Sequence, residues 1–137
     1  MPRTVTLAAT LPRSPARLYA MYLSHREHAA FTGAPVKIAA RPGAHFEAFG
    51  GALTGTILQV VPNRLIVQSW RSTQFAKRDL DSTLVLSFWP DTAGGRIELT
   101  HVNVAETDFA GVSEGWSRYY WVPWRAYLEK RGRPRAR

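Results

Sequence analysis

The hydrophobic and polar residues of this chain follow two different periods. Between Arg3 and Ala9, apolar Val5, Leu7 and Ala9 alternate with small polar or neutral residues, which predicts a strand. Six further segments are short, rich in β-branched and aromatic residues, and separated by turn residues: 36–39, 44–49, 53–61, 65–71, 83–89 and 96–102. Because their connections are too short for crossover helices, we expect these strands to pair antiparallel.

Three segments instead show signals of helices. Ser14 and Pro15 are typical of a helix start, so a helix is predicted through Tyr22, and a second short helix follows from about residue 25 to 31 and ends before Gly33. A long terminal helix is predicted from residue 109 to about 130, where apolar residues recur every three or four positions. Pro123 lies inside it and should bend the helix or leave one carbonyl without a partner.

This order of elements predicts an α+β helix-grip fold. A curved antiparallel β-sheet would wrap around the long C-terminal α-helix, with the two short helices after the first strand closing one end. A bent sheet cannot lie flush against a straight helix, so a cavity is expected between them. We assign residues 1–129 to this single domain and residues 130–137 to a basic, flexible tail.

Composition narrows the possible partners. The formal net charge is +8, but five basic residues lie in the last eight positions, so the body lacks the basic stripe of a nucleic-acid-binding face. There is no cysteine, which excludes disulfides and thiolate nucleophiles. No segment has the length and apolarity of a signal peptide core or a membrane span. We therefore expect a cytoplasmic protein without a nucleic-acid partner.

The sequence shows no catalytic or metal-binding motif. His25 and His28 are three residues apart, unlike the four-residue spacing of zinc-protease helices, and are predicted to lie on a solvated helix surface. Residues 111–115 spell G-x-S-x-G, but inside the predicted terminal helix rather than at a strand-to-helix turn. No catalytic residue, metal or cofactor is assigned, and an enzyme using His101 as an acid or base remains a lower-ranked alternative.

The predicted inward face of the sheet suggests a binding site for a hydrophobic small molecule. His101 shares a strand face with Ile97 and Leu99, and Gln68 shares one with Trp70. Aromatic walls with a few polar anchors are typical of ligand pockets. The predicted ligand-binding residues are Phe46, Gln68, Trp70, Phe88, His101, Trp116, Tyr119 and Tyr120. Alternatively, Gln68 and His101 only bond each other, a tyrosine or trapped water inside a filled core.

Several segments resemble one known family. They are residues 31–35, 42–46, 62–71, 81–84 and 99–101, with the helix segment 115–124 as the most specific. Together they are similar to proteins homologous to the C-terminal domain of the activator of Hsp90 ATPase, within the START/Bet v 1-like (SRPBCC) superfamily. The resemblance implies the helix-grip fold and either a hydrophobic ligand or a protein-interaction role. Eukaryotic co-chaperones of this family carry an additional N-terminal domain that engages Hsp90. This chain begins at the first strand, which makes a chaperone partner the weaker expectation; the oligomeric state stays open.

Overall fold

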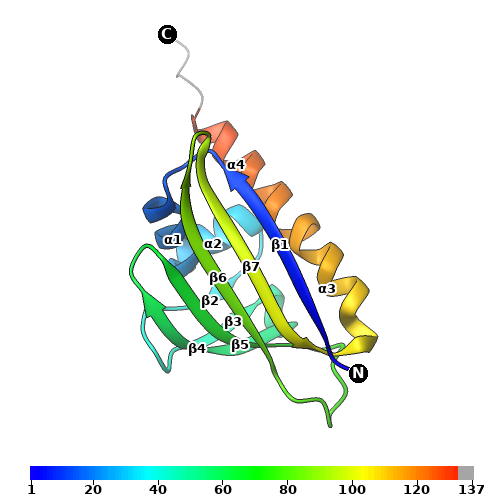
Figure 1. The fold of residues 1–137 in the computed structure, drawn as a ribbon. Helices are drawn as coiled ribbons and strands as arrows, with labels where there is room; N and C mark the ends of the chain where they lie inside the picture. The colour runs from blue at the N-terminus through cyan, green and yellow to red at the C-terminus, as the bar shows by residue number, and fades with distance from the viewer. Residues whose placement is uncertain (133–137) are drawn as a thin grey trace.

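Seven strands form one antiparallel sheet in the computed structural model, which describes residues 1–132 (Figure 1). The spatial order is β1-β7-β6-β5-β4-β3-β2, so every strand after β1 pairs with its neighbour in sequence, and β1 closes against β7. The strands are β1 (Arg3–Leu11), β2 (Val36–Lys37), β3 (His45–Ala48), β4 (Leu53–Val61), β5 (Leu65–Ser72), β6 (Ser82–Asp91) and β7 (Gly94–Val104).

The helices cover one face of this sheet. They are α1 (Pro15–Leu23), α2 (His25–Thr32), the short turns η1 (Phe49–Gly51) and η2 (Glu106–Asp108), then α3 (Phe109–Gly115), η3 (Trp116–Trp121) and α4 (Val122–Gly132). The hydroxyl of Ser14 accepts a hydrogen bond from the Arg17 amide (3.2 Å), and Ser24 does the same for α2. Gly33, at φ 80°, ends α2 in the left-handed conformation.

The predicted α+β helix-grip fold is confirmed. A curved antiparallel sheet, a long C-terminal helical segment and two short helices after the first strand are all present. The element bounds differ in detail: β2 is only two residues long, and α4 continues to Gly132. The first part of the predicted tail is therefore helical, and residues 133–137 lie outside the described residues.

The irregularity predicted at Pro123 takes the form of π-helical turns just before it. Pro123 has no N–H to donate to the carbonyl of Tyr119, four residues earlier. In η3 the Val122 amide instead bonds the Ser117 carbonyl, five residues back. Such turns hold more residues than α-helical turns and are frequent at functional sites.

The π-helical segment keeps the apolar face of the terminal helix on the sheet. A four-residue spacing overshoots one α-helical turn by about 40°, so a stripe at that spacing would rotate away from its partner. The wider turns of η3 absorb this drift and bury two adjacent rings, Tyr120 and Trp121. The buried positions are Val112, Trp116, Tyr120, Trp121, Trp124 and Leu128.

β4 carries a bulge between Ile57 and Gln59, where its register with β5 shifts by one residue. Two residues before this bulge, at Gly55, β4 approaches β5 closely, and the next amide, that of Thr56, donates to the Ser69 hydroxyl (2.9 Å). A Cβ at Gly55 would lie 1.9 Å from the Ser69 carbonyl oxygen, so only glycine allows this approach. In Figure 1, β3 and β4 turn away from the direction of β7 and β1.

We predict that Gly55→Ala destabilises the fold by at least about 2 kcal/mol, because the clash is with backbone and no rotamer relieves it. The matched control is Gly115→Ala, whose Cβ would meet only Tyr119 at 3.5 Å in a helical backbone. It should stabilise the fold by up to about 1 kcal/mol. Urea unfolding of both variants tests this, and equal stabilities would contradict the close approach of β4 to β5 at Gly55.

Candidate functional site

A cavity of about 500 Å³ opens between the end of the sheet and the first half of the terminal helix. Its walls come from η1, β4 and β5 on one side, and from α3 and η3 on the other. The aromatic side chains that line it are Phe49, Trp70, Trp116, Tyr119 and Tyr120. The polar and charged ones are Ser72, Thr73, Gln74, Asp108, Glu114 and Arg118.

The structure brings half of the predicted ligand-binding residues to this cavity. Trp70, Trp116 and Tyr120 are almost wholly buried in its walls, and Tyr119, half exposed, lies at its rim. The choice of the Trp70 face as the inward face of β5 is confirmed by the burial of Ile66, Gln68 and Trp70. The remaining predicted residues lie in the core and do not line the cavity: Phe46, Gln68, Phe88 and His101.

Phe49 is a wall residue that the sequence reasoning missed. Its backbone adopts φ 52°, the left-handed region that bulky residues avoid, at a cost of about 1–3 kcal/mol. Gly50 and Gly51 continue the same conformation, so the chain turns sharply and the ring points back to η3. There it packs against Tyr119 (5.7 Å between ring centroids) and Tyr120 (6.2 Å). An aromatic residue followed by Gly-Gly was the available signal.

His101 joins the terminal helix to the sheet. The indole N–H of Trp116 donates to Nδ1 of His101 (3.2 Å), which fixes the other nitrogen, Nε2, as the one carrying the proton. That proton faces the Ser82 hydroxyl (2.8 Å), which in turn donates to the Trp70 carbonyl (2.6 Å). Burial lowers the pKa of His101 from its ordinary 6.5 to about 3, so the ring is neutral.

His28 is buried rather than solvated, which corrects the sequence-based prediction. Its Nδ1 faces the Tyr22 carbonyl (2.7 Å) and its Nε2 faces the Tyr120 hydroxyl (2.8 Å), so Nδ1 donates and Nε2 accepts. Burial lowers the pKa of His28 to about 4 against the opposing effect of the Tyr22 carbonyl, and burial raises that of Tyr120. The ring also stacks on Phe31, at 5.1 Å between centroids. The helical pairing of His28 with Phe31 was the only sequence signal.

Gln68 and His101 do not bond each other. The Tyr22 hydroxyl donates to Oε1 of Gln68 (2.6 Å), while His101 is satisfied by Trp116 and Ser82. The Nε2 atom of Gln68 has no hydrogen-bond partner among residues 1–131. Of the alternatives left open by the sequence, the bond to a tyrosine is the one that Gln68 makes.

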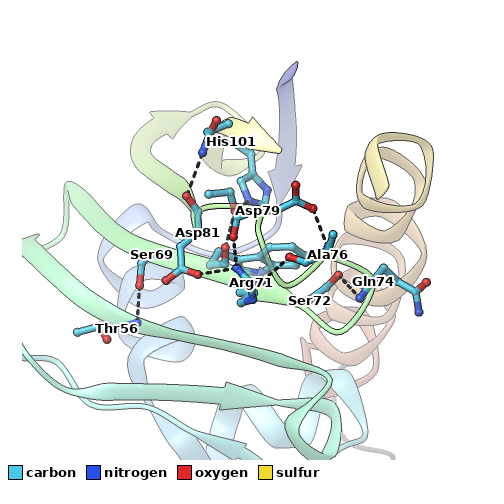
Figure 2. Close-up of polar contacts among 12 residues, drawn as sticks. Thr56, Ser69, Arg71, Ser72, Gln74, Ala76, Asp79, Asp81 and His101 are labelled. Carbon is cyan, nitrogen blue, oxygen red and sulfur yellow. Dashed lines mark hydrogen bonds and ion pairs between the residues drawn. The ribbon is translucent and has the colours of Figure 1, made fainter. Parts of the chain in front are cut away.

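The β5–β6 connection is folded around the Arg71 side chain (Figure 2). The guanidinium donates to the carbonyls of Asp79 (2.7 Å) and Ala76 (2.7 Å) and pairs with the Asp81 carboxylate (3.2 Å). This arrangement seats Phe75 against Trp70, at 5.9 Å between ring centroids. The loop therefore backs the Trp70 wall of the cavity.

A buried carboxylate lies at one end of the cavity. Asp108, 9% exposed, is in η2 and accepts a hydrogen bond at Oδ2 from the Ser72 hydroxyl (2.6 Å). The same hydroxyl accepts from the Gln74 amide (3.0 Å), as Figure 2 shows. Asp108 stands at the N-cap position of α3, yet its side chain makes no cap hydrogen bond.

Residues 1–132 hold no cluster of three or more His, Cys, Asp or Glu side chains that would suit a metal ion. Ser113 of the G-x-S-x-G segment lies in α3 and donates to the Phe109 carbonyl (2.8 Å). None of the helices described is long and apolar enough to cross a membrane.

Comparisons with known proteins agree on one family. A family model described as Activator of Hsp90 ATPase homolog 1-like protein matches residues 12–129. The human Activator of 90 kDa heat shock protein ATPase homolog 1 is 27% identical over 116 residues, covering 85% of this chain and 34% of the human protein. A homologue from Dictyostelium discoideum is also 27% identical, covering 30% of its length. The chain thus spans about a third of the curated relatives it matches.

Solved structures share the fold at low sequence identity. An HSP90 activator from Plasmodium falciparum superposes with a TM-score of 0.79 at 16% identity, covering 96% of this chain and 97% of that one. A protein from Mesorhizobium loti gives a TM-score of 0.80 at 17% identity, covering 93% and 98%.

Because His28 and His101 are buried and neutral, we predict that the free energy of unfolding falls in mild acid. Both are neutral in the folded state at pH 7, while an unfolded histidine takes up a proton near pH 6.5. Between about pH 6.5 and 4 the unfolded state binds more protons, so the free energy of unfolding decreases by up to about 1.4 kcal/mol per pH unit for each histidine.

Urea unfolding at about pH 7.5 and about pH 5 measures this slope. His101→Gln should reduce it, and His25→Gln, which changes an exposed histidine, should leave it as in the unmodified chain. A slope that is unchanged in His101→Gln would show that His101 is not the neutral, buried group described above.

Proposed function

The chain belongs to the Activator of Hsp90 ATPase homolog 1-like protein family, and from this premise we propose that it binds an apolar small molecule in the cavity between β5 and the terminal helix. The observation that carries the proposal is the cavity itself. Its volume of about 500 Å³ falls within the usual range of ligand pockets, and five aromatic side chains line it.

The walls of the cavity are held in place before any ligand arrives. Trp116 is tied to the sheet through His101, and Tyr120 is tied to α2 through His28. Phe49 is fixed by its contacts with Tyr119 and Tyr120 despite its strained backbone. A preformed site loses little conformational entropy on binding, which favours affinity.

The geometry favours binding over catalysis by a histidine. Both ring nitrogens of His101 are engaged, by Trp116 and Ser82, and both of His28 by Tyr22 and Tyr120. Neither histidine lines the cavity. A general acid or base must reach the reacting group directly or through one water, and these rings lack a free nitrogen to do so.

We predict that filling the cavity removes binding. The neutral apolar probe 1-naphthylmethanol should bind the unmodified chain saturably in isothermal titration calorimetry. Ala52→Phe places a ring in the cavity wall and should weaken binding by at least about tenfold, because the probe and the ring compete for the same volume.

The matched control is Ala110→Phe, the same change at an exposed position of α3 that does not line the cavity. It should alter the affinity by less than about twofold. Absence of saturable binding to the unmodified chain, or equal weakening in both variants, would argue against the proposed site.

A second candidate function is binding to an Hsp90-type chaperone. It is favoured by the descriptions of the relatives as activators of a 90 kDa heat shock protein ATPase. The Plasmodium falciparum chain described as an HSP90 activator is covered over 97% of its length by this single helix-grip unit. An isolated unit of this size is therefore a reasonable partner for such a chaperone.

For this candidate we expect the chain to raise the steady-state ATP hydrolysis rate of full-length human Hsp90 in a saturable manner. Ala52→Phe and the unmodified chain should act equally if the chaperone contacts an outer surface rather than the cavity. No change in rate, together with no binding by calorimetry, would leave the small-molecule function as the supported one.

A further inference from the structure

Asp108 is a buried carboxylate whose charge has no cationic partner in the part of the chain described. Its only hydrogen bond there comes from the neutral Ser72 hydroxyl, to Oδ2 (2.6 Å). No ion pair or second hydrogen bond within residues 1–131 reaches Oδ1. Buried charges are ordinarily paired or hydrogen-bonded several times, because removing them from water is costly.

The local backbone leaves Oδ1 accessible from the cavity. Asp108 and Gly111 both line it, and a Cβ built on Gly111 would lie only 3.0 Å from Oδ1. The missing side chain at Gly111 therefore keeps space beside this oxygen. Asp108 does not use Oδ1 to cap α3, although it stands at the cap position.

No other charged side chain described at the cavity forms an ion pair with the Asp108 carboxylate. Glu114 and Arg118 are exposed at the rim, one of each sign, and the Arg118 guanidinium lies 6.0 Å from the Tyr119 ring centroid. Nearby Arg3 is placed over the Phe109 ring, at 3.8 Å. The buried end of the cavity is thus negative in a chain whose net charge is +8.

Aromatic rings enclose the space next to this carboxylate. Trp116 and Tyr120 are tilted by 48° at 4.7 Å between centroids, and Phe49 meets Tyr120 nearly edge-on. Rings of tryptophan and tyrosine attract organic cations as well as apolar groups, and the attraction is stronger where water is excluded. An anion would meet both the ring electrons and the Asp108 charge unfavourably.

We infer that the ligand of this cavity is an aromatic or apolar amine, whose ammonium group donates to Oδ1 of Asp108 while its apolar body lies among the rings. This rests on the proposed small-molecule function and specifies its ligand class. The ammonium supplies the charged hydrogen-bond donor that the buried carboxylate lacks, and such bonds are stronger than neutral ones.

Three probes with the same ring system test the inference by calorimetry. We expect 1-naphthylmethylamine to bind at least about tenfold more tightly than neutral 1-naphthylmethanol, and anionic 1-naphthoate to bind most weakly. Asp108→Asn retains an acceptor for Ser72 and should remove the preference for the amine, leaving the affinity for the alcohol within about twofold.

The control variant is Glu106→Gln, which neutralises an exposed acid of the same turn, η2, that does not line the cavity, and it should preserve the amine preference. If the alcohol binds and the amine binds no better, the ligand class is wrong while the small-molecule function stands. If none of the three probes binds, both fail. If Asp108→Asn does not fold, the affinities of the three probes for the unmodified chain test the inference instead. Tighter binding of 1-naphthoate than of 1-naphthylmethylamine would overturn it.

Discussion

The whole structure depends on keeping a helix in contact with a sheet that curves away from it. In β4 a bulge between Ile57 and Gln59 follows Gly55, where β4 comes closer to β5 than any side chain would allow. The terminal helix contains the π-helical turns of η3 just before Pro123. These turns bury the adjacent side chains of Tyr120 and Trp121 against the sheet. The cavity lies between η1 and α3, where the sheet and the helix are not packed against each other.

Two buried, neutral histidine rings hold the terminal helix to the rest of the fold. His101 connects Trp116 of the helix to Ser82 of the sheet, and His28 connects Tyr120 to the end of α1. Each ring uses one nitrogen as donor and one as acceptor, so both polar atoms are satisfied in the core. Among the cavity residues, Asp108 is the one buried charged side chain. The charge that a ligand would meet inside the cavity is therefore that of Asp108 and not that of a histidine.

The fold could be predicted from sequence because its signals are local. Alternation along β5 to β7 and the capping residues Ser14 and Gly33 depend on neighbours in the chain. The cavity walls Trp70, Trp116 and Tyr120 followed from the same periodicity. His28 and Asp108 could not be recognised, because their burial depends on contacts with Tyr120 and Ser72, which lie 92 and 36 residues away in the chain.

The five tryptophans occupy three distinct surroundings, which gives the protein a built-in optical reporter. Trp70 and Trp116 border the cavity, Trp121 and Trp124 are buried along the helix, and Trp89 is 46% exposed on β6. Indole emission shifts to longer wavelength as water gains access, so Trp89 emits at longer wavelength than the four buried tryptophans. Replacing Trp89 by phenylalanine would therefore leave an emission spectrum that comes from the four buried tryptophans. A molecule that enters the space beside Trp70 and Trp116 would change this emission without any added dye.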